Sequence, residues 1–534
     1  MKHLPLLLAA CLVLAAGCAV SPEASQVAVN PLTYTDIPDN DVIRVGEDYY
    51  MVSTTMYFCP GAPIMQSRDL VHWRIVDYIY DYLEDDDIYN LRGGANAYGK
   101  GQWATTLRYE NGRFWALFIA NDQRKTYIYS TPAIGEKWTR QVIDRPFHDA
   151  SLLFEDGRVY VVWGNGEIHI TELEPDFSGV REGGVDQVLF TCPREGYGLR
   201  AEGAHIYHIG DWYYVLVIDW PSGGPRTETC WRSRELLGTY EPKTILQGAF
   251  DGRQDGVAQG AIVQTQQGDW YAVMFQDHGA VGRIPTLQPL TWVDGWPILG
   301  DNGVPVKEFS VNLPPDGEDY VWASDEFDSD RLALVWQWNH KPLDGCWSLT
   351  ERPGWLRLTT GQLATGLADA RNTLTQRTFG PQCTSGVLLD GSGLQVGDFA
   401  GLSAFQSCRA DIGLRRTEAG LELYAVQEVP QRGPDRTVTR VQRELLCEPA
   451  PKETVQLRIR YDFDKDQAWL GYCWGEVGPA SGDSAGIMLG WVELPEPLQM
   501  RYTLDYFTGY RSALYCYATQ NLGGHADFDW FHQE

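Results

Sequence analysis

Residues 42–50, VIRVGEDYY, contain an apolar strand, a turn centred on Gly46 and a second strand rich in aromatic residues. The pattern recurs four times, with turn glycines roughly 45–66 residues apart. The further copies are LRYENGRFW (107–115), LLFEDGRVY (152–160), IYHIGDWYY (206–214) and IVQTQQGDWY (262–271). Self-similarity at about this period is typical of propeller blades, and helical periodicity of useful length is absent. The sequence therefore predicts an all-β fold that begins with a five-bladed β-propeller.

The hairpin repeat ends at a stretch that contains three prolines, which indicates a domain boundary. A chain of 534 residues also exceeds what one hydrophobic core usually serves. We assign the propeller to residues 30–303 and a linker to residues 304–318. Beyond them, strands such as 354–358 and 455–461 have the spacing of a β-sandwich. Residues 319–534 are therefore predicted to form a jelly-roll β-sandwich.

The N-terminus has the features of an export signal. Lys2 precedes an apolar run over residues 4–16 that is too short to span a membrane in the mature protein. The sequence LAAGC at residues 14–18 resembles a bacterial lipoprotein signal, in which Cys18 is lipidated; ordinary cleavage without a lipid is the alternative. Residues 1–18 are thus predicted to be a signal peptide and residues 19–29 a tether. The expected location is exported, at the cell surface or on the periplasmic side of a membrane, with membrane contact only through this anchor.

Composition narrows the class of partner. A net charge of −28 argues against nucleic acid, which is bound by basic patches. The 20 tryptophans and 28 tyrosines suit a concave site for a neutral ligand, because such rings offer both an apolar face and a polar group. The nine cysteines after Cys18 are scattered and odd in number, so we interpret them as isolated buried thiols.

Three carboxylates occupy matching positions in the repeat. Asp39, Asp149 and Glu202 precede the turn glycine by seven or eight residues in the first, third and fourth copies, where the second and fifth have Ala104 and Gly260. The first strand of each propeller blade lines the central channel, so residues at the starts of these strands converge at one mouth. Each acid alone reads equally well as part of a turn, but three at equivalent positions indicate a site.

Cleavage of a glycosidic bond needs two carboxyl groups in different protonation states. One protonated acid donates a proton to the leaving oxygen, and one ionised carboxylate activates water or attacks directly. A third acidic group nearby raises the pKa of its neighbour by like-charge repulsion and keeps the acid protonated.

Several segments resemble glycoside hydrolase family 43. These segments are residues 30–46, 67–73, 148–152, 201–207, 275–283 and 292–300. The resemblance covers about residues 30–305 and implies a five-bladed propeller with inverting exo-glycosidase chemistry on plant pentosans. It also implies that Asp39 is the general base, Asp149 the pKa modulator and Glu202 the general acid. The family usually has a proline after the base, whereas Asn40 and Asp41 follow here, so Asp41 is a rival for that role.

The resemblance implies further site residues. His278 would lie in the channel, near a bound calcium or a water cluster, and Arg283 would hold the substrate or the modulator. Calcium prefers oxygen ligands, so one histidine does not establish a metal site. Trp103, beside the opening of the second blade, is a candidate for a ring that faces the sugar, with core packing as the alternative.

The C-terminal part resembles the concanavalin A-like sandwich that follows the propeller in several subgroups of the family. The motifs that carry the resemblance are residues 324–327, 347–354, 370–376 and 526–531. It implies a sandwich that docks beside the active-site mouth and can lend it a loop. The first and last motifs could share a structural calcium, or they could be paired edge strands without a metal.

These observations predict an inverting exo-glycosidase that releases terminal α-L-arabinofuranose or β-D-xylose from plant hemicellulose or its oligosaccharides. No cofactor is required in this reading, and calcium would be structural. Two alternatives stay open: a non-catalytic carbohydrate-binding propeller, and a retaining or phosphorolytic propeller glycosidase.

Overall fold

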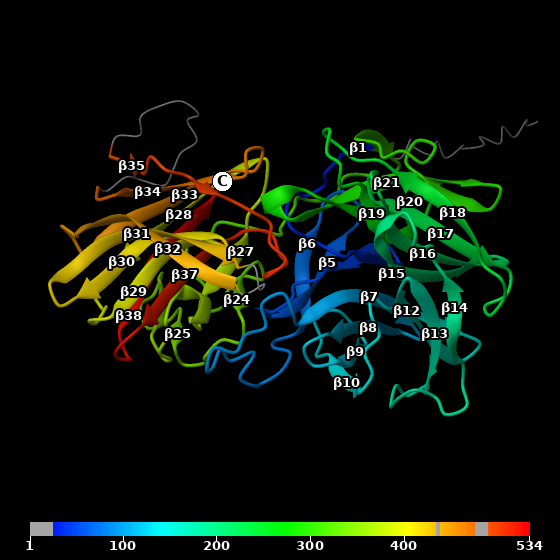
Figure 1. Ribbon diagram of the computed structural model, residues 1–534, viewed down its shortest axis with the longest axis horizontal. Helices are drawn as coiled ribbons and strands as arrows, with labels where there is room; N and C mark the ends of the chain where they lie inside the picture. The colour runs from blue at the N-terminus through cyan, green and yellow to red at the C-terminus, as the bar shows by residue number, and fades with distance from the viewer. Residues whose placement is uncertain (1–24, 434–437, 476–489) are drawn as a thin grey trace, which may run out of the picture.

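The computed structural model describes residues 25–433, 438–475 and 490–534 as two β-domains that lie side by side (Figure 1). The helical segments in these ranges are two three-residue 3₁₀ turns, Gly279–Val281 and Leu367–Asp369. No described helix is long and apolar enough to cross a membrane. The predicted all-β class is confirmed, as is the order of a five-bladed propeller followed by a sandwich. The signal peptide and Cys18 lie outside the described residues.

Each hairpin of the repeat forms the two inner strands of a four-stranded blade, and two further strands complete it. The inner strands contact one another in sequence around the ring, and the last contacts the first. From the inner strand outward the blades are β2 (Asp41–Val45), β3 (Asp48–Val52), β5 (Gly61–Ser67) and β6 (Arg74–Tyr80); β7 (Gln102–Glu110), β8 (Arg113–Ala120), β9 (Lys125–Thr131) and β10 (Thr139–Ile143); β11 (Ser151–Glu155), β12 (Arg158–Asn165), β13 (Glu167–Leu173) and β14 (Asp186–Thr191); β15 (Tyr197–Ile209), β16 (Trp212–Pro221), β17 (Thr227–Ser233) and β18 (Glu241–Gln247); and β19 (Val257–Gln264), β20 (Trp270–Asp277), β21 (Arg283–Val293) and β22 (Trp296–Leu299).

Buried polar side chains tie neighbouring blades together along the channel. Asp41 Oδ2 accepts hydrogen bonds from Leu107 N (2.8 Å) and Arg108 Nη1 (2.7 Å), which joins the first blade to the second. Arg108 Nη2 in turn donates to Ser151 Oγ (2.6 Å), and the same hydroxyl accepts the backbone N–H of Ile206 (3.2 Å). These hydrogen bonds form one chain that links four blades. The role of Asp41 in this chain is structural.

The ring closes through the segment before the first blade. Leu32 N donates to Pro285 O (2.9 Å) and Ile37 N to Arg283 O (2.9 Å), so this segment lies along the fifth blade. Upstream, β1 (Gln26–Val29) pairs with β23 (Glu308–Val311) in an antiparallel sheet of two strands. The predicted tether and the predicted linker thus each contain a strand. Each strand has only four residues, too few for the sequence to show a period.

The sandwich consists of two sheets of eight strands each, with a core of their facing side chains. The first sheet contains β24 (Gln337–Asn339), β27 (Leu374–Arg377), β29 (Asp398–Phe405), β30 (Arg409–Thr417), β31 (Gly420–Arg432), β32 (Val438–Pro449) and β37 (Arg511–Ala518), and its eighth strand comes from the propeller. The second contains β25 (Trp347–Ser348), β26 (Leu356–Thr359), β28 (Gln382–Asp390), β33 (Thr454–Asp462), β34 (Gln467–Cys473), β35 (Val492–Glu493) and β38 (His525–Gln533), and β36 (Leu498–Gln499) also pairs with β34.

The eighth strand of the first sheet, β4 (Phe58–Cys59), joins the two domains. It lies between the second and third strands of the first blade but pairs with β24 of the sandwich. A hydrophobic cluster shared by both domains surrounds it. The nine described cysteines are unpaired, and most are buried as expected. Cys447 is exposed instead, because it lies on the edge strand β32.

Replacement of Asp41 by alanine tests the channel network. The change leaves the Arg108 guanidinium without its carboxylate in a largely buried position, so we expect the free energy of unfolding to fall by about 3–5 kcal/mol in urea titrations. Asp48→Ala is the matched control, because its partner Arg68 is half exposed. This change should cost about 1 kcal/mol or less. Equal losses in the two variants would contradict the assigned role of Asp41.

Candidate active site

The three predicted carboxylates leave the backbone at irregular points of three inner strands. Asp39 and Asp149 stand just before β2 and β11 with φ angles of 53° and 44°, a left-handed conformation that aspartate tolerates better than most residues. Glu202 lies in β15 between two shifts of strand register. Such bulges redirect side chains and are common beside active sites. The structure brings the three together, since the charges of Glu202 and Asp39 both act on Asp149.

Asp39 is held on both of its oxygens. Oδ2 accepts a hydrogen bond from the Thr54 hydroxyl (2.7 Å), and Oδ1 accepts one from Arg283 Nη1 (2.6 Å). The Arg283 guanidinium lies over the rings of Phe275 and Phe507, at 5.2 and 4.8 Å from their centroids. Burial alone would lower the pKa of Arg283, but the negative charge of Asp39 raises it above its ordinary value. The base candidate therefore has a permanent cation as its partner.

Asp149 and Glu202 share a histidine. His148 Nε2 lies 3.0 Å from Glu202 Oε2 and 3.7 Å from Asp149 Oδ2. Burial raises the pKa of Asp149 to about 7, against the opposing charge of His148. Burial would lower the pKa of His148, but Asp149 and Glu202 raise it to about 9. An imidazolium thus lies between two carboxyl groups at neutral pH, and burial raises the pKa of one of them, Asp149.

Asn165 completes the surroundings of Glu202. Its side-chain Nδ2, at the end of β12, donates to Glu202 Oε2 (2.5 Å). Sequence reasoning missed both Asn165 and His148, although His148 stands directly before Asp149 in a quoted motif. A single sequence gives no signal for Asn165, because only the ring of blades brings it to Glu202.

Trp103 lies at the mouth and is partly exposed. Its ring centroid is 6.1 Å from that of His148 and 5.7 Å from that of Phe507. Phe507 belongs to the sandwich, in the segment before β37. The sandwich therefore contributes an aromatic ring beside Trp103 and Arg283, a residue that the sequence did not single out.

A family model for glycosyl hydrolases family 43 matches residues 28–297, half of the chain. The chain belongs to glycosyl hydrolase family 43. A second model, for the beta xylosidase C-terminal concanavalin A-like domain, matches residues 324–534. The two matches coincide with the propeller and the sandwich, and they make the chain a glycoside hydrolase.

Relatives of this family 43 protein carry two kinds of name. A protein called beta-xylosidase from Formosa agariphila is 26% identical over 573 residues, which cover 94% of this chain and 89% of that protein. The non-reducing end alpha-L-arabinofuranosidase BoGH43B of Bacteroides ovatus is 30% identical over 359 residues, or 63% of this chain and 65% of that protein. A solved structure described as a bifunctional GH43-CE of Bacteroides eggerthii has a TM-score of 0.86 at 38% identity. The match covers 96% of this chain, which spans only 64% of that longer protein.

His278 does not have the surroundings of a calcium ligand. Its Nε2 is hydrogen-bonded to the Tyr34 hydroxyl (2.8 Å), and its Nδ1 lies 3.4 Å from Gln276 Nε2. Neither partner supplies a carboxylate oxygen, which calcium prefers. Burial lowers the pKa of His278 to about 4, so the ring is neutral at physiological pH. Among the described residues, the side chains close enough to hold a metal are His148, Asp149 and Glu202.

Of the two alternatives for the first and last sandwich motifs, the paired strands fit better than a shared calcium. Asp527 is paired with Arg352 and Arg357, at 2.9 and 2.7 Å. Asp325 accepts hydrogen bonds from Phe327 N and Trp336 Nε1, both at 2.8 Å. The carboxylates of Asp325 and Asp527 thus have protein donors as partners, and the two motifs are joined by a bridge between Asp325 and Phe531.

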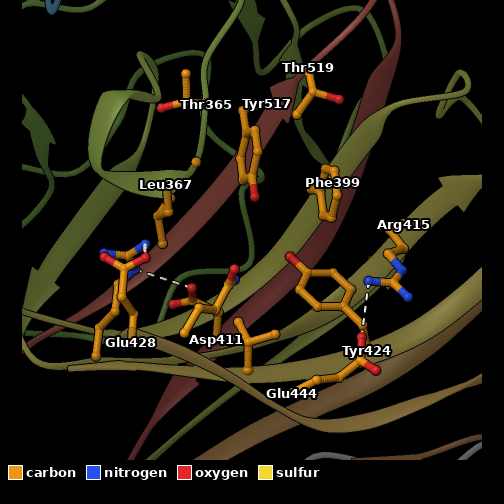
Figure 2. Close-up of a pocket in the computed structure, with 14 residues that line it drawn as sticks. Thr365, Leu367, Phe399, Asp411, Arg415, Tyr424, Glu428, Glu444, Tyr517 and Thr519 are labelled. Carbon is orange, nitrogen blue, oxygen red and sulfur yellow. Dashed lines mark hydrogen bonds and ion pairs between the residues drawn. The ribbon is translucent and has the colours of Figure 1, made fainter. Parts of the chain in front are cut away.

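A separate pocket of about 330 Å³ lies on the first sheet of the sandwich, the one that contains β29 to β32 and β37 (Figure 2). Tyr424, Tyr517 and Phe399 line it, and the rings of Phe399 and Tyr517 stack 5.0 Å apart. Its charged side chains form ion pairs, such as Arg415 with Glu444 (3.3 Å). This pair reaches from β30 across β31 to β32, so it is part of the surface of the sheet.

Replacement of His148 by glutamine should change how stability depends on pH. The pKa of His148 is raised from 6.5 to about 9 in the folded protein. Its stabilisation is therefore complete below about pH 6.5 and is lost as the pH rises through about 9. We expect wild type to exceed the variant by on the order of 2 kcal/mol in free energy of unfolding near pH 6, and by little near pH 10. A difference that does not vary with pH would contradict this assignment.

Proposed function

We propose that this family 43 protein is an inverting exo-glycosidase that releases a terminal pentose from plant hemicellulose or its oligosaccharides. The observation that carries the proposal is the different surroundings of the acids at one channel mouth. Asp39 faces the Arg283 cation, whereas burial raises the pKa of Asp149 to about 7. An inverting hydrolase needs an acid and a base that hold different numbers of protons, and the raised pKa of Asp149 supplies a proton directly beside Glu202, the proposed acid.

Asp39 acts as the general base in this mechanism. Thr54 and Arg283 hold its two oxygens, and the guanidinium compensates its charge. The carboxylate takes a proton from a water molecule that attacks the anomeric carbon from the face opposite the leaving group. Inversion needs about 6.5–9.5 Å between the two acting carboxyl groups, so that this water fits between them.

Glu202 acts as the general acid and donates its proton to the leaving oxygen. Asn165 and His148 fix the position of its Oε2. Asp149 is the modulator: the charges of Glu202 and Asp39 act on it, so the proton shared among these acids depends on all of them. After the bond breaks, Glu202 regains a proton from solvent and the product leaves with the opposite anomeric configuration.

The sugar is proposed to be α-L-arabinofuranose, with β-D-xylose as a second substrate. The relatives named above carry one or the other activity in their names. Trp103 and Phe507 frame the mouth with apolar rings, which suits the face of a small neutral sugar at a chain end. Metal chemistry is not part of the proposal.

Two variants separate the roles of acid and base. Glu202→Gln should lower kcat by about 10²–10⁴-fold on aryl pentosides with poor leaving groups, and far less on 2,4-dinitrophenyl pentosides, which need no proton. Asp39→Asn should lower kcat by a similar factor whichever leaving group is used. Asp211→Asn is the control, because this exposed residue lies in the turn between the strand that carries Glu202 and the next strand.

Near-normal release of pentose by both variants would contradict the mechanism and favour a non-catalytic carbohydrate-binding propeller. A requirement for inorganic phosphate would instead favour a phosphorolytic enzyme.

We also propose that the protein is exported and anchored by a lipid on Cys18. Support comes from the apolar run over residues 4–16 and the LAAGC sequence that ends it. In a bacterial host, wild type should incorporate radiolabelled palmitate and sediment with membranes, whereas Cys18→Ala should do neither. Unlabelled wild type in the soluble periplasmic fraction would contradict the anchor.

A further inference from the structure

Two arginines of the sandwich stand directly opposite each other on neighbouring strands. Arg377 of β27 and Arg511 of β37 are register partners in the antiparallel ladder. Their exposed fractions are 1% and 3%, so both guanidinium groups are buried. Like charges at directly opposed positions destabilise a sheet, and the cost rises when both are removed from water. A fold that keeps this pair needs compensation nearby.

The protein partners of the two guanidiniums are mostly neutral. Arg377 Nε donates to the backbone oxygen of Asp36 (3.1 Å). Arg511 Nη1 donates to Gln337 Oε1 (2.9 Å), and its guanidinium lies 3.7 Å from the centroid of the Phe58 ring. Amide oxygens and an aromatic face satisfy N–H groups, but they carry no net charge.

The guanidinium of Arg377 has N–H groups beyond the one that Asp36 O accepts. Among the described residues, neither Nη1 nor Nη2 has a hydrogen-bond partner of regular geometry, and both atoms are buried. The Tyr78 hydroxyl lies near this guanidinium; it donates to Leu334 O (2.7 Å), and its oxygen can accept from Arg377, which leaves further N–H groups unpartnered. The hydroxyl of Tyr57, another neighbour of Arg511, is also buried, with Thr508 beside it. Several unused donors thus surround the arginine pair.

The carboxylate of Asp36 acts on Arg511, and it is engaged elsewhere. Asp36 Oδ1 accepts Arg283 N and Oδ2 accepts Gly509 N, both at 2.8 Å. Burial raises the pKa of Asp36, so its negative charge is itself disfavoured. Burial and the charge of Arg377 lower the pKa of Arg511 to about 9, which still leaves it cationic at neutral pH. The interface therefore holds an excess of buried positive charge.

We propose that a small monovalent anion such as chloride binds between Arg377 and Arg511, in the interface between the propeller and the sandwich. Water could accept the N–H groups of Arg377, but it would not compensate the charge. The enclosure by residues of both domains favours a small ion over a bulky one. The site is separate from the carboxylates of the channel mouth.

The position gives the ion a role in joining the domains. Arg511 follows Gly509, whose N–H is held by Asp36 of the propeller. Phe507, on the same segment, lies against Arg283 at the mouth. An anion here would hold the propeller, the sandwich and this segment together.

The direct test is crystallography of the full chain in sodium bromide, with anomalous scattering to locate the ion. We expect a bromide peak within hydrogen-bond distance of the Arg377 Nη atoms and beside Arg511. Density at this place without an anomalous signal, as water would give, would overturn the proposal. So would bromide found at surface arginines alone.

A solution measurement tests the same site without activity. At constant ionic strength, the melting temperature of wild type should rise, with saturation, as chloride replaces gluconate, because the ion binds the folded state. Arg511→Gln should lose this dependence. The matched control is Arg409→Gln, since Arg409 is equally buried in the same sheet but paired with Glu428 (2.6 Å). The control should melt lower and keep its response to chloride; identical melting of wild type in the two salts would refute the site.

Discussion

The buried ion pair between Asp39 and Arg283 is the interaction on which the site depends. It joins the first blade to the fifth, and therefore closes the ring at the place where the candidate base stands. The backbone N–H of Arg283 is held by Asp36, which also holds Gly509 of the sandwich. The guanidinium lies against Phe507 on its other side. Ring closure, position of the base and docking of the second domain thus share one arginine.

The remaining acids work through their mutual repulsion and their burial. Asp149 has a raised pKa because it is buried beside Glu202 and Asp39, and His148 lies between Asp149 and Glu202 as a cation. A set of acids so arranged can keep one proton at the mouth at neutral pH, which hydrolysis of a glycoside requires. The three acids are far apart in the sequence and come from different blades, and the closed ring of the propeller brings them together.

The sequence was informative where a pattern repeats. Five hairpins predicted five blades, and the carboxylate that opens three of them predicted the convergence at one mouth. The hydrogen bonds of Asp41 to Leu107 and Arg108 could not be foreseen, because they depend on the packing of the second blade against the first. Phe507 was also missed, since its segment meets the mouth only after the sandwich docks. The short strands β1, β4 and β23 were missed because two to four residues show no period.

In the proposed mechanism, water attacks opposite the leaving group, with Asp39 and Glu202 on the two sides of the bond. The measurement that tests it most directly is proton NMR of the first sugar released from an aryl pentoside by the native protein. We expect the first product to have the anomeric configuration opposite to that of the substrate, before mutarotation mixes the two. A first product that keeps the configuration of the substrate would contradict it.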